Sequence, residues 1–138
     1  MMSRYAHNKG VSLFVADDSD SYRTLLNIML QREGYEVSSF DNGFDALNAL
    51  SVFRPNLVIS DLEMPEMDGL DFYKEIQKRE LFEEPIPFVF ISSTGFKSKI
   101  DKAEKLSNRE LISKSLHPDC IVKIIEGVLR EYEKEGIE

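Results

Sequence analysis

Short apolar runs alternate along this sequence with longer segments in which apolar residues recur at helical spacing. The run "VSLFVA" over residues 11–16 has charged residues close to both ends, which is typical of a buried strand. Residues 20–33 follow with helical periodicity, with Ser19 or Asp20 as N-cap and Gly34 as stop. The apolar positions of this predicted helix are Tyr22, Leu25, Leu26, Met29 and Leu30. A strand therefore leads into a helix through an acidic turn.

The same alternation is repeated four more times. The later predicted strands are "YEVSSF", "NLVIS", "IPFVFIS" and "RELISK", and the helices are "GFDALNALSVF", "LDFYKEIQKREL", "SKIDKAEKL" and "HPDCIVKIIEGVLREYEKEG". In the first of these helices we expect Phe44, Leu47, Leu50 and Val52 on one face before Pro55. Pro118 suits the first turn of the last helix. Five strand-and-helix repeats predict a doubly wound α/β domain, with a five-stranded parallel sheet and helices on both faces.

Length and composition fit one domain. The 138 residues are 42% hydrophobic and 30% charged, as in soluble globular proteins, and no linker or repeat marks a domain boundary. We expect residues 1–10 to be a flexible N-terminus, residues 11–132 to be the folded domain and residues 133–138 to be a charged tail.

Net charge and apolar run lengths exclude several function classes. A formal charge of −8 disfavours direct nucleic-acid binding, and no segment approaches the roughly 20 apolar residues of a membrane helix. The N-terminus lacks the apolar core of a secretory signal, and a single cysteine fits a reducing compartment, so we expect a cytoplasmic location. We interpret that residue, Cys120, as a small buried hydrophobe rather than a reactive thiol.

Residues that can carry chemistry follow four of the predicted strands. They are Asp17 and Asp18 after the first strand, Asp61 after the third, Ser92 and Ser93 after the fourth, and Lys114 after the fifth. In a doubly wound fold these strand ends share one edge, where ligands bind. Carboxylates brought together there repel one another, and a hard cation such as Mg²⁺ bound through oxygen relieves that repulsion.

This set of residues predicts phosphoryl transfer to a carboxylate. Asp61 would attack a phosphoryl donor in line, while the cation, Lys114 and Ser92 stabilise charge on the transferred oxygens. No nearby side chain is an efficient hydrolytic base, so the acyl phosphate would persist as a signal.

Each residue also has a simpler interpretation. The aspartates after the first strand could only cap the next helix, Asp61 could be a surface acid, Ser92 an ordinary strand-end hydroxyl and Lys114 a solvated cation. The loop residues Pro65 and Gly69 shape a turn, and Glu66 and Asp68 are expected to be solvated. His7 and His117 are interpreted as spacer or cap.

From about Val11 to Tyr132 the chain resembles the receiver domain of two-component response regulators, a flavodoxin-like fold. The matching motifs are "ADDSDSYR", "ISDLEMPEMDG", "FISS" and "ISK". The resemblance implies that Asp61 is the phosphoacceptor, that Asp18 binds Mg²⁺ directly and Asp17 through water, and that Glu63 lends its backbone carbonyl to the metal. Glu63 and Thr94 would border the phosphoryl group and tune its lifetime.

The resemblance also implies partners. A histidine kinase or histidine phosphotransfer protein would be the donor, and the switch surface would comprise the fourth helix, fifth strand and fifth helix. That surface would contact a downstream protein or an effector domain outside this chain, and it is a candidate homodimer interface. Autodephosphorylation would be slow.

Three positions depart from the family pattern. Ser115 replaces a proline that follows the lysine in a cis peptide, so the Lys114–Ser115 bond is either trans or strained. Leu111 replaces an aromatic residue that rotates on activation, and Ser107 with Asn108 replaces a Gly-Ala pair. We therefore expect the switch surface to differ in detail.

Two other functions remain open. One is a Mg²⁺-dependent phosphohydrolase with an aspartyl-phosphate intermediate, in which Asp18 or Asp20 would be labelled instead of Asp61. The other is a receiver that binds a partner without being phosphorylated.

Overall fold

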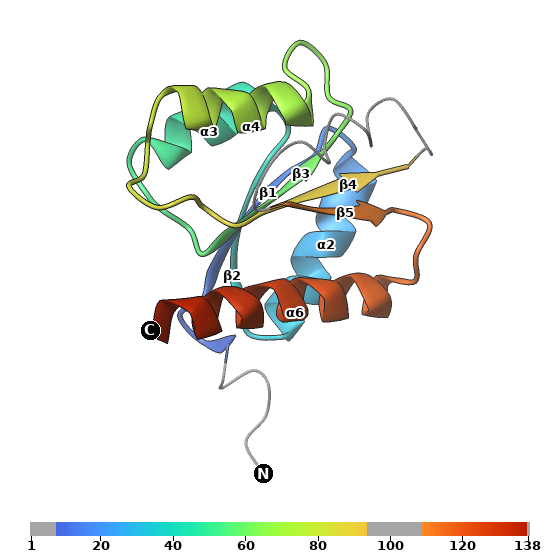
Figure 1. Cartoon of the computed structure of the whole chain (residues 1–138). Coiled ribbons are helices and arrows are strands. Elements are labelled where there is room, and N and C mark those ends of the chain that lie inside the picture. The colour runs from blue at the N-terminus through green and yellow to red at the C-terminus, as the bar shows by residue number, and fades with distance from the viewer. Residues whose placement is uncertain (1–7, 94–108, 138) are drawn as a thin grey trace.

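The computed structural model describes residues 8–93 and 109–137, and it contains one parallel sheet (Figure 1). The strands are β1 (Ser12–Ala16), β2 (Glu36–Phe40), β3 (Leu57–Asp61), β4 (Phe88–Ser92) and β5 (Arg109–Ser113). Their order in the sheet is β2-β1-β3-β4-β5, and every pair is parallel. The predicted doubly wound α/β fold with five parallel strands is therefore confirmed.

Four helices in the described residues cover both faces of this sheet. They are α2 (Asp20–Arg32), α3 (Gly43–Leu50), α4 (Gly69–Lys78) and α6 (Pro118–Ile137). In Figure 1, α3 and α4 lie on one face and α2 and α6 on the other. The helix predicted over "SKIDKAEKL" lies outside the described residues. No helix in the described part of the chain is long and apolar enough to cross a membrane.

The central strands separate two hydrophobic cores because alternate side chains point to opposite faces. In β1, Phe14 packs in the core under α3 and α4, while Leu13 and Val15 pack in the core under α2 and α6. β1, β3 and β4 are buried at every position, whereas the edge strand β2 has no buried residue. This burial on both faces explains the near-continuous apolar strands in the sequence.

Helix ends agree largely with the sequence signals. Ser19 is the N-cap of α2, where its hydroxyl accepts a hydrogen bond from Tyr22, and Gly34 after the helix has a φ of 99°. Pro118 begins α6. Asp68, which we expected to be solvated, instead caps α4 and forms a capping box with Asp71.

Two predictions about exposure are wrong. In α3, Leu47 and Leu50 are buried as expected, together with Ala46, but Phe44 is 46% exposed and Val52, beyond the helix end, is 86% exposed. Cys120 is exposed rather than buried, because the first turn of α6 directs it away from the core. Helical spacing identified both helices, but it assigned Phe44, Val52 and Cys120 to the wrong environment.

Gly69 joins the acidic loop to the end of β3. Its N–H donates to the Leu62 carbonyl at 2.9 Å, and a Cβ added at Gly69 would lie 2.4 Å from the Asp61 carbonyl oxygen. A side chain at this position would therefore push the start of α4 away from the strand that carries Asp61.

We predict that Gly69→Ala lowers the free energy of unfolding by about 1 to 3 kcal/mol, since the added methyl group meets rigid backbone. Gly127→Ala is the matched control, because nothing lies within 4 Å of an added Cβ in α6. There the exchange should raise stability by up to about 1 kcal/mol. Urea unfolding would measure both values, and equal stability of the two variants would contradict this account.

Candidate functional site

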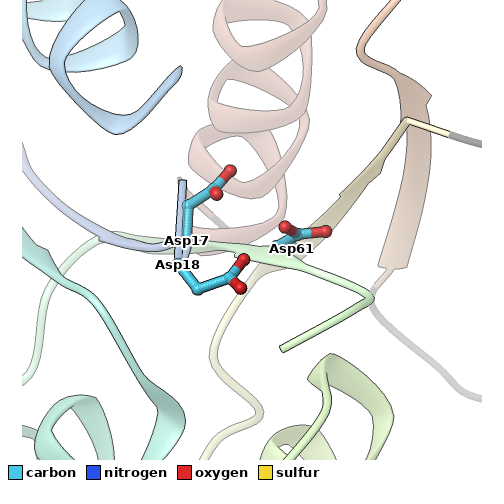
Figure 2. Close-up of side chains that lie close together, drawn as sticks. All are labelled: Asp17, Asp18 and Asp61. Atoms are coloured by element: carbon cyan, nitrogen blue, oxygen red, sulfur yellow. The ribbon is translucent and has the colours of Figure 1, made fainter. Parts of the chain in front are cut away.

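The carboxylates predicted to meet do meet at the carboxyl edge of the sheet. β1 and β3 are neighbours there because the strand order reverses between them, which is where doubly wound folds bind ligands. Figure 2 shows the side chains of Asp17, Asp18 and Asp61 close together, and one oxygen from each lies within 4.8 Å of the others.

Asp17 is fully buried, and the start of α2 holds it in place. Its Oδ1 accepts a hydrogen bond from the Ser19 N–H at 2.8 Å, and its backbone carbonyl accepts one from the Arg23 guanidinium at 2.6 Å. Arg23 is also paired with Asp20. Capping of α2 and chemistry at Asp17 are therefore compatible, since Ser19 supplies the cap.

Asp61, the last residue of β3, is only 4% exposed, which excludes the interpretation as a surface acid. Its Oδ1 accepts a hydrogen bond from the Glu63 N–H at 3.1 Å, and its Oδ2 accepts one from Lys114 Nζ at 3.1 Å. The two oxygens thus have different partners, a backbone amide and a cation.

Lys114 directly follows β5 and completes the site. Its N–H donates to the Ser92 carbonyl at 2.7 Å, which anchors the backbone. Its Nζ lies 2.8 Å from Asp17 Oδ2, 3.1 Å from Asp61 Oδ2 and 4.4 Å from the centre of the Tyr22 ring. The side chain is 12% exposed, so Lys114 is not a solvated cation, and the Lys114–Ser115 peptide bond is trans.

Ser92 lies beside the carboxylates but faces Glu63 in this structure. Its side chain is buried, and Oγ is 3.5 Å from Glu63 Oε1. The exposed Ser93 lines the shallow hollow above the carboxylates, together with Asp18 and Glu63. Thr94 lies outside the described residues.

Tyr22 is the site residue that the sequence did not identify. Its spacing placed it on the apolar face of α2, where it does pack against the core, and its ring also lines the hollow beside Lys114. Burial raises the pKa of the Tyr22 hydroxyl to about 12, with further contributions from Asp17 and Asp61. The only sequence signal was its position one turn after the acidic pair.

Burial and like charge dominate the electrostatics of the site. Burial raises the pKa of Asp61 to about 6 and Asp17 adds to this, while the Glu63 N–H and Lys114 act in the opposite direction. For Lys114, burial opposes the charge, but contacts with Asp17 and Asp61 outweigh it and raise the pKa. One ammonium therefore does not fully offset three carboxylates.

The site suits a hard divalent cation. Asp17 Oδ2 is buried, and within the described residues it accepts no hydrogen bond. Its contact with Lys114 is an ion pair that lacks hydrogen-bond geometry. Such an oxygen, with those of Asp18 and Asp61 close by, is the ligand type that Mg²⁺ and Ca²⁺ prefer.

The raised pKa of Asp61 predicts a pH-dependent cost of folding without divalent cations. The folded chain binds this proton more tightly than the unfolded chain, so the contribution to stability is complete below the ordinary pKa of 3.8 and is lost as pH rises to about 6. With a chelator present, Asp61→Asn should raise the free energy of unfolding by about 2 kcal/mol at pH 8.

That gain should shrink toward zero as pH falls to about 4, as measured by urea unfolding at a series of pH values. Asp20→Asn removes a carboxylate that is 88% exposed, so its effect should not follow this profile. A gain for Asp61→Asn that is constant across the pH range would contradict the assignment of the shift to Asp61.

Comparisons with known proteins agree with this geometry. The model of the response regulator receiver domain matches residues 13–126. Chemotaxis protein CheY1 of Helicobacter pylori is 34% identical over 121 residues, which are 86% of this chain and 97% of that protein. The solved structure of the chemotaxis response regulator CheY4 of Vibrio cholerae has a TM-score of 0.77 at 25% identity, over 86% of this chain and 98% of that one.

Other relatives are longer. Transcriptional regulatory protein GlrR of Escherichia coli is 29% identical over 124 residues, which cover 90% of this chain but only 27% of that protein. The match to the family model, the similarity to CheY1 and the acidic pocket at Asp17, Asp18 and Asp61 all lead to the same conclusion. The chain belongs to the response regulator receiver domain family of two-component signalling.

Proposed function

We propose that Asp61 accepts a phosphoryl group from a histidine kinase or histidine phosphotransfer protein. The observation that carries this proposal is a buried carboxylate whose Oδ2 contacts Lys114, within 4.8 Å of oxygens from Asp17 and Asp18. With a pKa of about 6, Asp61 is mostly ionised at neutral pH and can act as a nucleophile.

In the proposed step an Asp61 oxygen attacks the phosphorus of the donor phosphohistidine. The P–N bond breaks, its electron pair remains on the imidazole, and an acyl phosphate forms on Asp61. Lys114 follows the negative charge onto the phosphoryl oxygens, and the Ser92 hydroxyl donates to one of them after leaving Glu63.

Mg²⁺ is the cofactor we propose for this site. Asp18 and Asp61 would bind it directly, Asp17 through water and Glu63 through its backbone carbonyl. The ion supplies neutralisation of charge on the transferred oxygens. The Glu63 N–H donates a hydrogen bond to Asp61 Oδ1, so the backbone of Glu63 is close enough for this role.

We further propose that residues 11–132 act as the switch unit, whose output surface comprises residues 98–106, β5 and α6. The Lys114 backbone is hydrogen-bonded to the sheet at the end of β5. A movement of its side chain toward a phosphoryl group would therefore change the conformation of that surface. A downstream protein, an effector domain or a second copy would bind there, in the cytoplasm. The phosphohydrolase alternative has less support, because Asp20 is exposed and paired with Arg23.

Incubation with acetyl phosphate and Mg²⁺ should add the mass of one phosphoryl group, seen by intact-protein mass spectrometry. Asp61→Asn should abolish this uptake, since the amide is not a nucleophile, while Asp20→Asn should retain it. Uptake that survives in Asp61→Asn but is lost in Asp20→Asn would favour the phosphohydrolase.

Mg²⁺ should raise the melting temperature, and the rise should grow with the logarithm of Mg²⁺ concentration once this exceeds the Kd, because a ligand that binds only the folded chain stabilises it. Asp18→Asn should raise the Mg²⁺ concentration needed for the same rise in melting temperature at least tenfold. Asp45→Asn, at the exposed start of α3, should leave that concentration unchanged. If Mg²⁺ shifts neither the unsubstituted chain nor the control, the domain is a receiver that works without phosphorylation.

A further inference from the structure

We propose that Tyr22 is a positioning residue, whose ring holds the Lys114 ammonium in place for phosphoryl transfer to Asp61. The inference rests on the proposed function of Asp61 and adds a residue to it. Tyr22 comes from the first turn of α2, whereas Lys114 follows β5, so only the folded chain brings them together.

The contact between them is a cation–π interaction. Lys114 Nζ lies over the Tyr22 ring, 4.4 Å from its centre, while Asp17 and Asp61 bind the same nitrogen at 2.8 and 3.1 Å. The face of an aromatic ring carries negative potential and attracts an ammonium, most strongly where water is excluded. The ammonium therefore has two carboxylates and one ring as neighbours.

The backbone that carries the ring is linked through Ser19 to the same carboxylate that Lys114 binds. Asp17 Oδ1 accepts from the Ser19 N–H at 2.8 Å, and Ser19 Oγ accepts from the Tyr22 N–H at 3.4 Å. These contacts form a closed loop that runs from Asp17 through Ser19, Tyr22 and Lys114 back to Asp17. A lysine side chain has four flexible bonds, and this loop of contacts limits the positions that the Lys114 ammonium can occupy.

The two ion pairs depend on the charge of Asp17 and Asp61, whereas the attraction of the ring for the ammonium does not. A divalent cation bound directly by Asp61, and through water by Asp17, would compete with Lys114 for these carboxylates, and phosphorylation turns the Asp61 carboxylate into the uncharged acyl part of a mixed anhydride. Neither change alters the face of the Tyr22 ring. Tyr22 would therefore keep Lys114 over the hollow when its carboxylate partners are engaged elsewhere.

The hydroxyl group is not needed for this role. Tyr22 Oη is buried and has no hydrogen-bond partner within the described residues. Tyr22→Phe consequently keeps the ring and loses no hydrogen bond, whereas Tyr22→Leu keeps an apolar side chain and loses the ring. This pair separates the cation–π contact from ordinary packing.

The kinetic test measures the rate of Asp61 phosphorylation by acetyl phosphate with Mg²⁺. Tyr22→Leu should slow it about three- to tenfold, Tyr22→Phe should stay within about twofold, and Ile28→Ala, an exposed control on α2, should have no effect. In a Lys114→Gln background, Tyr22→Leu should cause no further slowing, because its effect passes through Lys114.

A second readout needs neither metal nor donor. In proton–carbon correlation NMR spectra of the free protein, the Lys114 side-chain protons should be shifted upfield by the ring current. They should keep that shift in Tyr22→Phe and lose it in Tyr22→Leu. Equal slowing by both substitutions, or full slowing by Tyr22→Leu without Lys114, would overturn the proposal. If the unsubstituted chain takes up no phosphoryl group, the function proposed for Asp61 fails, whatever residue 22 is.

Discussion

The ammonium of Lys114 stands between the buried carboxylates of Asp17 and Asp61, and the site is built around this contact. A parallel sheet gathers its carboxyl ends at one edge, so acids placed there are forced together and out of water. The pKa of Asp61 is raised to about 6, first by burial and further by Asp17, although the Glu63 N–H and Lys114 act in the opposite direction. The clustered carboxylate oxygens make this edge suited to a divalent cation.

The rest of the fold holds these groups at fixed positions. β1 and β3 are buried on both faces, which gives Asp17 and Asp61 rigid supports. The cap of α2 at Ser19 also binds Asp17, so the start of this helix and the geometry of the acid depend on each other. Gly69 lets α4 begin against the Asp61 carbonyl. The site is therefore part of the packing of the sheet and helices.

Much of this could be predicted from the sequence, because apolar runs ending in acids fix both the strands and the residues at their ends. Asp61 follows from "NLVIS" in this way. Side-chain direction could not be predicted, since helical spacing defines a face without saying what it meets. For that reason Phe44 and Cys120 were expected in the wrong environment. Tyr22 packs against the core as its spacing predicts, but its contact with Lys114 was not predicted. That contact joins the start of α2 to the end of β5, which no local pattern records.

The most direct test of the central claim is to locate the phosphoryl group chemically. After reaction with acetyl phosphate and Mg²⁺, borohydride reduces an aspartyl phosphate to homoserine, and peptide mass spectrometry then identifies the converted residue. The account predicts homoserine at position 61 and unchanged aspartates at positions 17, 18 and 20. Homoserine at position 18 or 20, or at none of these positions, would contradict it.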